Sequence, residues 1–368
     1  MKIRSVETRV IEIPFEDGRE AFGLTPSGWK TLETVLIRVE DTDGNVGWGE
    51  AFGYFVADAV CSVVETRVKP LTEGSTIESI SAWSQATQRA LHIFGRYGIT
   101  MFAISGVDMA LWDLAAKRAK SPLWKLLGGE QAGSLRTYAS LVRYNDPLVT
   151  SALCQRALDE GYRDIKLHEI SIDVVEAAHA QVAGRAPISV DVNCAWDDTD
   201  APNNIERLRA LESIAWVEEP IFPPEDFTRL AGLRTHGVPV AAGENWCTST
   251  QFKQAIEAGA VDFLQPSVTK VGGITEFVEI MSLARDAKLG VLPHSPYFGP
   301  GLIATLHLAT AYQSASDTLQ VEYHYANPAA ELIDLTPIRD RHQFRLNDAP
   351  GLGLAPDGAV VTQFVRAR

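Results

Sequence analysis

Three acidic residues each follow a short apolar run in the middle of the chain. Asp191 follows Ile-Ser-Val, Glu218 follows Ile-Ala-Trp-Val, and Glu244 follows Val-Pro-Val-Ala-Ala-Gly. They lie 27 and 26 residues apart, which is about the length of one strand-plus-helix unit. Such spacing can bring carboxylates from separate strands together at one end of a barrel, where oxygen ligands hold a hard cation such as Mg²⁺. A cation there would stabilise the charge formed when a carboxylic acid loses its α-proton, so the pattern predicts an enzyme.

Other polar residues stand where neighbouring apolar runs end. Lys166 and His168 are two residues apart on a predicted strand, so both side chains are expected to point into the barrel mouth. A lone polar residue of this kind is more often structural, but here successive units all end in groups useful for one reaction. In chain order, the further candidates are Asn193, Glu219, Ser267, Lys270, His294 and Glu322.

The second part of the chain has the regular spacing of strands and helices that is typical of a barrel. Apolar strand candidates recur every 23 to 29 residues, starting near positions 135, 163, 187, 215, 238, 261, 289 and 318. Amphipathic stretches at Val174–Ala183, Phe252–Ala258 and Ile274–Ala287 fill the gaps. Eight strand-then-helix units favour a (β/α)₈ barrel. The rival is a doubly wound open sheet, but an early GxGxxG fingerprint is absent.

The first part of the chain is predicted to be a separate α+β unit. Strands are expected at Ile3–Pro14, Thr31–Val39 and Val46–Ala51, and the glycines at 44, 47 and 49 are interpreted as turn chemistry. Helical patterns follow at residues 57–68, 77–92 and 100–119. The tail from about Tyr323 is expected to return to this unit and to end in a strand at Ala359–Val365.

Composition excludes several partners. The 368 residues carry a formal charge of −14 without a basic stripe, which argues against nucleic acid. No apolar run approaches the roughly 18 residues of a membrane span, and Met1–Val10 has no signal-peptide core. The four cysteines form no CxxC pair, so we expect reduced thiols and a cytoplasmic location.

Read together, these motifs carry a family resemblance. The order Lys-x-His, Asp-x-Asn, Glu-Glu-Pro, Gly-Glu-Asn, Val-Gly-Gly, Pro-His and a last Glu resembles the enolase superfamily, in its branch of mandelate racemase and muconate lactonizing enzyme. Residues 103–114 and 122–129 resemble the helix and linker that open the barrel of that family. The resemblance covers nearly the whole chain.

The resemblance implies a fold and a cofactor. Residues 1–125 would form an α+β capping domain, residues 126–322 a modified (β/α)₇β barrel, and residues 323–368 a segment that packs back on the cap. Mg²⁺ would bind Asp191, Glu218 and Glu244, with Asn193 and Glu219 orienting the ligands. The step shared by the family is removal of a proton next to a carboxylate, which gives an enediolate. We also expect a small-molecule carboxylate as substrate and a homo-oligomer.

Substrate specificity is expected from two loops of the cap, Glu16–Trp29 and Glu50–Phe55. Within them, Trp29 and Tyr54 are the aromatic residues expected to contact the substrate. Lys270 is a further candidate for substrate contact.

Two departures from the family pattern bear on the reaction. His168 stands where racemase-like members carry a second Lys, and a Lys166 ammonium beside it would keep it neutral; either residue could be the base. Ser267 stands where those members have an Asp that pairs with the histidine of the seventh strand. A serine can orient His294 but cannot stabilise its charge, which favours His294 as an acid. Glu322 would hold the opposite enediolate oxygen and would need a raised pKa.

These features leave three hypotheses open. The favoured one is a dehydratase of a hydroxy acid, in particular an acid sugar, that yields a 2-keto acid. The alternative is a racemase, epimerase or cycloisomerase that uses the same enediolate. A non-catalytic binding protein that kept the barrel is the third, and it is disfavoured by the full set of carboxylates, Lys166 and histidines.

Overall fold

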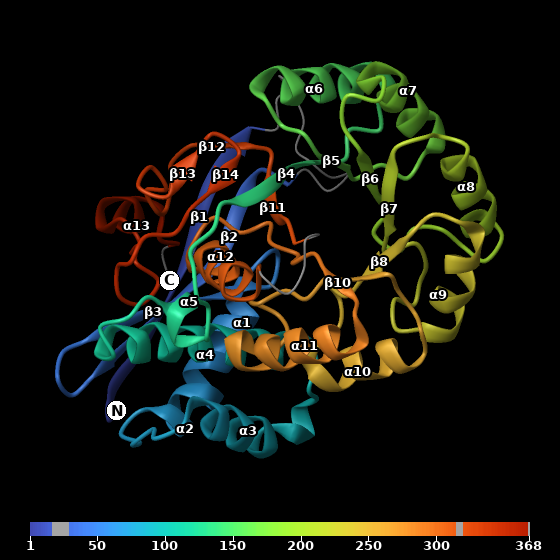
Figure 1. Ribbon diagram of the computed structural model, residues 1–368. Coiled ribbons are helices and arrows are strands. Elements are labelled where there is room, and N and C mark those ends of the chain that lie inside the picture. Colours follow the sequence, from blue (N-terminus) through green and yellow to red (C-terminus); the bar gives the residue numbers. More distant parts are fainter. Residues whose placement is uncertain (17–28, 314–318, 367–368) are drawn as a thin grey trace.

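The computed structural model describes residues 1–16, 29–313 and 319–366 (Figure 1). The N-terminal sheet is antiparallel, with β1 (Ile3–Glu16), β2 (Thr31–Asp41) and β3 (Val46–Phe52) in the order β12-β1-β2-β3. Strand β12 (Asn327–Pro328) comes from the tail. The three strands predicted in this region are confirmed, because apolar residues alternate toward one buried face.

Helices cover this sheet. The first predicted helix, residues 57–68, consists of α1 (Ala57–Val63) and the π-helical turn Val64–Val68, and α2 (Lys69–Thr72) follows directly. The other helices are α3 (Ile80–Ala90) and α4 (Gly98–Arg118). Helix α4 is apolar and long enough to cross a membrane, contrary to our expectation from the apolar runs, but 78% of the relevant window is buried inside the protein. It is therefore a core helix.

Two of the glycines interpreted as turn chemistry have a different role. Gly44 lies in the turn, with φ of +86°. Gly47 and Gly49 instead lie in strand β3, where helix α4 approaches the sheet closely. A Cβ atom on Gly47 would lie 2.1 Å from the carbonyl oxygen of Ala110. The interpretation was therefore wrong for these two positions, which are glycine because of packing.

This close approach predicts the effect of one substitution. Gly47→Ala is expected to destabilise the protein by about 1–3 kcal/mol, because helix α4 must move to admit the methyl group. The matched control is Gly232→Ala on α9 (Phe227–Leu233), where a Cβ would meet nothing within 4 Å. Urea-melt midpoints check the pair, and equal midpoints for both variants would contradict the packing argument.

The rest of the chain forms the barrel. Its strands pair in parallel in the order β10-β9-β8-β7-β6-β5-β4, and β11 pairs with β4 to continue the circle. The loop after β10 is joined to β11 by a hydrogen bond from Ser295 N to Glu322, 2.8 Å long. The eight strands are β4 (Leu135–Leu141), β5 (Ile165–Leu167), β6 (Ile188–Asp191), β7 (Ile214–Glu218), β8 (Val240–Ala242), β9 (Phe263–Leu264), β10 (Gly290–Val291) and β11 (Val321–His324).

Seven principal helices connect these strands and surround them (Figure 1). They are α6 (Pro147–Glu160), α7 (Ile172–Val182), α8 (Asp200–Arg209), α9, α10 (Thr248–Glu257), α11 (Gly273–Ala287) and α12 (Pro300–Tyr312). The short α5 (Leu123–Leu126) precedes the first strand. This is the predicted (β/α)₇β arrangement, and parallel pairing around a circle excludes the doubly wound open sheet.

The tail contacts both parts of the molecule. The short strands β13 (Arg339–Asp340) and β14 (Gln343–Phe344) extend the barrel sheet at β4. The strand predicted at Ala359–Val365 is wrong, because residues 359–364 belong to helix α13 (Gly358–Phe364) and only Val365 pairs with a strand, as an isolated bridge to Ile11. The Asp357 carboxylate caps this helix by accepting the N–H groups of Ala359 and Val360.

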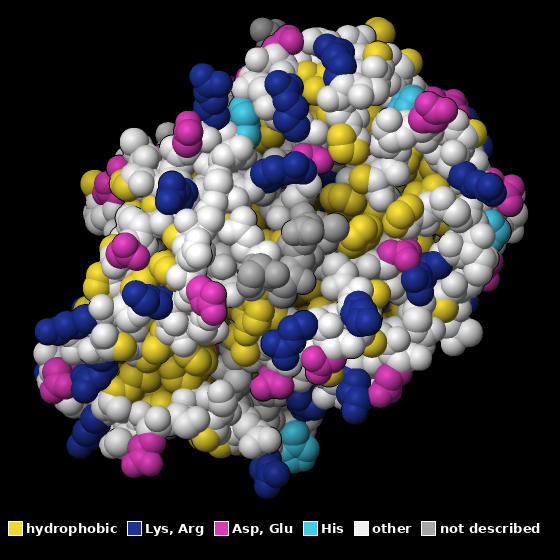
Figure 2. All heavy atoms as spheres, in the orientation of Figure 1, with side chains coloured by type: hydrophobic (Ala, Val, Ile, Leu, Met, Phe, Trp, Pro, Cys, Tyr) yellow, Lys and Arg dark blue, Asp and Glu magenta, His cyan; other side chains and the backbone are white. Residues whose placement is uncertain are grey.

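The end of the chain lies against the N-terminal sheet. Arg366 donates its backbone N–H to Val10 O (2.9 Å), and its guanidinium pairs with Glu12 (2.7 Å from Nε). The domain boundaries at residues 125 and 322 stay predictions. On the face shown in Figure 2, basic and acidic side chains are interspersed.

Candidate functional site

The three predicted carboxylates meet at the carboxyl end of the barrel strands. Asp191 ends β6, Glu218 ends β7, and Glu244 follows β8 by two residues. One ligand oxygen from each lies within 4.8 Å of the others. Asp191 and Glu218 are fully buried, and Glu244 is half-buried. Three converging carboxylates match the hard oxygen ligands that Mg²⁺ and Ca²⁺ prefer, so the residues present fit a divalent metal ion.

Neighbouring groups fix these carboxylates in place. Glu218 accepts hydrogen bonds from Gln265 Nε2 (2.6 Å) and Trp216 Nε1 (3.1 Å). Asp191 accepts from the backbone N–H of Asn193 at 2.9 Å. Burial, together with the charge of Asp191, raises the pKa of Glu218 well above its usual value. Closely spaced buried carboxylates favour a bound positive charge, which is what a metal ion provides.

Glu219 holds the backbone next to Glu244, the third carboxylate. Its Oε1 accepts the backbone N–H of Gly243, the residue before Glu244, at 3.0 Å. Burial and then the charge of Glu244 raise the pKa of Glu219 to about 8. This contact gives Glu219 a means of orienting Glu244, as its predicted auxiliary role requires.

Lys166 lies among acidic groups. Its Nζ is 2.8 Å from both Glu218 Oε1 and Glu322 Oε1, and 3.3 Å from Asp191 Oδ2. Burial opposes the charged form, but the surrounding carboxylates outweigh it and raise the pKa of Lys166 well above its ordinary value. The side chain is buried and therefore acts as a fixed positive charge under the site.

His168 reaches the cluster from the same strand end. Its Nδ1 lies 2.5 Å from the carbonyl oxygen of Leu141, which can only accept, so Nδ1 carries a proton. Its Nε2 lies 3.2 Å from Asp191 Oδ2. The ring is half-buried and lines the cavity over the carboxylates. Nε2 is thus the atom available for proton exchange.

His294 approaches from the other side. Its Nε2 lies 2.7 Å from Glu244 Oε2, and Nδ1 is buried without a hydrogen-bond partner among the described residues. We predicted that Ser267 would orient His294, but the Ser267 hydroxyl bonds instead with the hydroxyl of Tyr297. The prediction was wrong because Tyr297, three residues beyond His294, reaches Ser267 and occupies its hydroxyl.

Glu322 is held by donors. Its carboxylate accepts from Ser140 Oγ at 2.6 Å and from Ser295 N at 2.8 Å, in addition to its pair with Lys166. Burial would raise its pKa, but the charges of Lys166 and His294 hold the pKa of Glu322 well below its usual value. The predicted raised pKa is therefore not found, since the sequence did not show how close Lys166 lies.

A cavity of about 210 Å³ lies above these groups. The N-terminal part of the chain contributes Phe52 of β3, Trp29 just before β2 and Tyr54 just after β3 to its wall. The Trp29 and Tyr54 rings are 4.9 Å apart, and Tyr54 donates its hydroxyl to Pro296 O at 2.5 Å. Residues 17–28 of the predicted specificity loop lie outside the described residues. The barrel contributes Ser140, Val142, Arg143, His168, Asn193, Glu244, Lys270, His294, Pro296, Glu322 and His324.

Lys270, a predicted candidate for substrate contact, lines this cavity. It is buried, and its Nζ lies 4.4 Å from the centre of the Phe52 ring. Burial alone would raise the pKa of Glu244. The charges of His294 and, more weakly, of Lys270 outweigh burial and hold the pKa of Glu244 well below its usual value. Asn193 lines the same wall and is exposed to solvent.

Sequence reasoning missed several cavity residues, among them Arg143 and His324. Arg143 donates to Asn193 Oδ1 at 2.6 Å and to the carbonyl oxygen of His168 at 2.9 Å. His324 is the last residue of β11. Both follow the same rule as the predicted residues, since each stands at or just after the end of a barrel strand. Applying that rule to the first and last strands would have found them.

A buried carboxyl group joins the cap to the barrel beside this site. Glu50 of β3 accepts from Thr34 Oγ1 (2.9 Å) and from Gly301 N (2.8 Å) in the first turn of α12. Burial raises the pKa of Glu50 to about 7. The folded state therefore binds this proton more tightly than the unfolded chain does.

This shift predicts a pH dependence of stability. A raised carboxyl pKa favours folding at low pH, and that contribution is lost as pH rises from about 4.5 to about 7. Glu50→Gln removes the ionisation, so its urea midpoint should fall less between pH 5 and pH 7.5 than that of the wild type. Exposed Glu257→Gln is the matched control. An equal fall in wild type and Glu50→Gln would contradict the assignment.

The fold and this centre define the class: a barrel enzyme with a carboxylate metal site under a capping sheet. Residues 15–128 match the family described as mandelate racemase / muconate lactonizing enzyme, N-terminal domain, and residues 150–360 match enolase C-terminal domain-like. The chain belongs to the enolase superfamily, in the branch of mandelate racemase and muconate lactonizing enzyme. The predicted family is confirmed.

Three relatives illustrate what the chain is similar to. Arabinonate dehydratase of Saccharolobus solfataricus is 31% identical over 92% of each chain. The 3,6-anhydro-alpha-L-galactonate cycloisomerase of Streptomyces coelicolor is 32% identical over 72% of this chain and 74% of its own. The crystal structure of a racemase from Streptomyces coelicolor A3(2) with bound magnesium has a TM-score of 0.84 at 27% identity, covering 99% of this chain and all of the other.

Proposed function

We propose that this chain is an Mg²⁺-dependent dehydratase that converts a hydroxy carboxylic acid, specifically an acid sugar, to a 2-keto acid. One observation carries the proposal. Two histidines from well-separated strand ends reach the metal carboxylates, His168 beside Asp191 and His294 beside Glu244. Their strands, β5 and β10, are three positions apart around the eight-stranded circle. A base and an acid can therefore act on one substrate between them.

The roles follow from this arrangement. A Mg²⁺ ion held by Asp191, Glu218 and Glu244 would supply positive charge to the substrate carboxylate. His168 Nε2 accepts the α-proton as the C–H bond breaks. His294 gives a proton to the β-hydroxyl, so that the C–O bond breaks and water leaves. The enol that remains becomes the 2-keto acid by tautomerisation.

Lys166 is the alternative base, but two observations favour His168. The Lys166 ammonium is already surrounded by Asp191, Glu218 and Glu322, whereas His168 lines the cavity. We expect His168→Asn to reduce exchange of the substrate α-hydrogen with D₂O by about 10²–10⁴-fold, as loss of a general base does. Undiminished exchange in His168→Asn, with loss in Lys166→Met, would assign the base to Lys166.

Isomerisation is the second candidate, and the similarity to a cycloisomerase supports it. Racemisation asks each face of the site to act as a base in one direction. His294 lacks a carboxylate on Nδ1 among the described residues, which favours elimination over racemisation. The similarity to arabinonate dehydratase supports elimination of water from an acid sugar. The cytoplasmic location and the homo-oligomer stay predictions.

A substrate screen tests the proposal. The purified protein would be incubated with a panel of acid sugars and smaller hydroxy acids, with Mg²⁺ or with excess EDTA, and 2-keto acids would be trapped with semicarbazide. We expect at least one acid sugar to give a 2-keto acid only when Mg²⁺ is present. Formation of 2-keto acid in excess EDTA would exclude the metal assignment.

A further inference from the structure

His324 stands across the cavity from the metal carboxylates. It lies two residues beyond Glu322 on β11, so the alternation of a strand places both side chains on the same face. Strand β11 is four positions from β7 around the eight-stranded circle, and β7 ends with Glu218. His324 and the carboxylate of Glu244 line the same cavity, so one ligand in that cavity can contact both.

The ring of His324 is held by aromatic residues. Its centre lies 5.8 Å from that of Trp29 and 6.1 Å from that of Phe15, the latter pair with their planes 75° apart. These contacts come from β1 and from the residue two positions before β2, and they hold the ring in the cavity wall. Because packing already fixes the orientation of this ring, binding a ligand atom does not require the side chain to lose further conformational freedom.

The Nε2 atom of His324 lacks a hydrogen bond. It is shielded from solvent and has no partner among the described residues. Burial lowers the pKa of His324 to about 4, so the imidazole is neutral at neutral pH. A neutral imidazole offers one donor and one acceptor, and a buried polar atom left without a partner is destabilising. A ligand group that can both donate and accept, such as a hydroxyl, would satisfy it.

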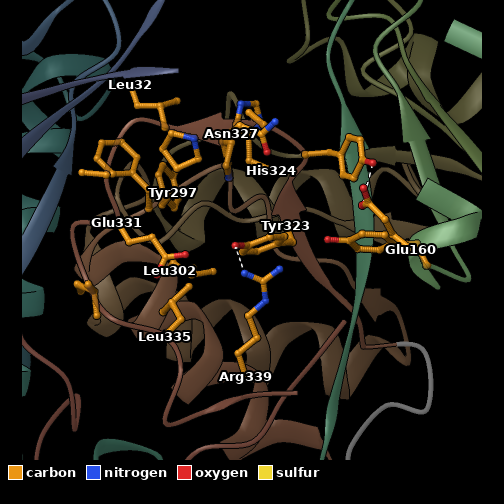
Figure 3. Close-up of a pocket in the computed structure, with 18 of the residues that line it drawn as sticks. Leu32, Glu160, Tyr297, Leu302, Tyr323, His324, Asn327, Glu331, Leu335 and Arg339 are labelled. Atoms are coloured by element: carbon orange, nitrogen blue, oxygen red, sulfur yellow. Dashed lines mark hydrogen bonds between the residues drawn. The ribbon is translucent and has the colours of Figure 1, made fainter. Parts of the chain in front are cut away.

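His324 borders two cavities. His324 and Pro296 also line a second cavity of about 410 Å³ (Figure 3). There the guanidinium of Arg339 donates to the Tyr323 hydroxyl at 2.9 Å, so these polar groups already have partners. His324 thus lines both cavities, and its Nε2 atom, unlike the guanidinium of Arg339 and the hydroxyl of Tyr323, has no hydrogen-bond partner among the described residues.

We propose that His324 is a substrate-binding residue that hydrogen-bonds through Nε2 to a hydroxyl on the substrate chain, beyond the two carbons that react. The inference rests on the proposed function and deepens it, because it makes a polyhydroxylated acid the preferred substrate. Apolar acids of the same length would leave Nε2 without a partner and would be discriminated against.

The test uses a ring of similar shape without polar atoms. His324→Phe keeps the contacts with Trp29 and Phe15 but can neither donate nor accept. We expect kcat/KM for the best acid sugar to fall about tenfold or more, since a buried hydrogen bond contributes about 1.4 kcal/mol. Single-position deoxy analogues of that substrate should then show which hydroxyl is recognised: wild type should lose activity on one analogue, and His324→Phe should not distinguish that analogue from its parent.

Two further variants make the result decisive. Tyr323→Phe, which changes the neighbouring residue on the side of the second cavity, should discriminate as wild type does, and His324→Gln should restore part of the preference. If His324→Phe does not fold, His324→Leu carries the same comparison. If His324→Phe (or His324→Leu) discriminated between the deoxy analogue and its parent as strongly as wild type does, the proposal would be overturned.

Failure of this inference can be told apart from failure of the proposed function. Mg²⁺-dependent exchange of the α-hydrogen with D₂O reports on the reaction centre and not on the distal hydroxyl. Exchange in wild type together with unchanged selectivity in His324→Phe would refute the role of His324 alone. No exchange or turnover with any hydroxy acid would refute the proposed function and, with it, the inference.

Discussion

Glu244→Gln is expected to lose at least about 100-fold of the metal-dependent activity while the protein stays folded. The loss of even a group that orients a metal ligand costs about 10–100-fold, and Glu244 is one of the three proposed ligands themselves. The substitution removes one of three negative charges that converge within 4.8 Å, and so weakens binding of a divalent cation. Initial rates would be measured against Mg²⁺ concentration after removal of metal with EDTA.

The matched control carries the same substitution outside the site. Glu257→Gln lies on α10, where Glu257 is exposed and paired with Lys253 at 3.8 Å. Its Mg²⁺ dependence should equal that of wild type. If Glu244→Gln kept both full activity and full Mg²⁺ affinity, Glu244 would not be a ligand, and the metal centre would have to be reassigned.

His294→Asn is expected to separate the two halves of the reaction. Removal of a general acid typically costs about 10²–10⁴-fold in rate, so formation of the 2-keto acid should fall by that amount. His168 lies beside Asp191, whereas His294 lies beside Glu244, so the substitution at His294 leaves His168 in place. His168 in the variant should therefore still exchange the substrate α-hydrogen. Product would be followed with semicarbazide, and exchange by ¹H NMR in D₂O.

The control for this variant is His92→Asn, since His92 is exposed on the capping domain. It should leave both product formation and exchange unchanged. Loss of exchange in His294→Asn, with exchange retained in His168→Asn, would reverse the assigned roles of the two histidines.

The metal carboxylates could be predicted because local rules decide where they lie. Asp191 and Glu218 each follow an apolar run, and the carboxyl ends of parallel strands meet at one end of a barrel. The period of two along a strand likewise placed Lys166 and His168 together. Their convergence therefore needed only the strand positions, which the 23- to 29-residue spacing supplied.

The partners of individual side chains could not be predicted in the same way. Whether Ser267 reaches His294 or Tyr297 depends on the path of the loop after β10, which no local pattern encodes. The charge state of Glu322 depends on a 2.8 Å approach by Lys166 from another strand. Such distances arise from packing of the whole barrel, so the predicted pKa of Glu322 was wrong although the barrel strands were predicted.

The error in the tail has a local cause. The residues from Ala359 to Val365 include three valines and a threonine, and β-branched residues are enriched in strands. The Asp357 cap and the packing of α13 beside β1 outweigh that preference. A capping residue before a short apolar segment was the signal that this part of the sequence offered.

The central claim is elimination of water, and the product formed in D₂O tests it most directly. The best hydroxy acid found in the screen would be incubated with the Mg²⁺-loaded protein and followed by ¹H NMR until the reaction stops. The account predicts loss of the substrate α-hydrogen signal and appearance of a 2-keto acid that reacts with semicarbazide. An epimer carrying deuterium at the α-carbon, with no 2-keto acid, would contradict the dehydratase and establish the racemase in its place.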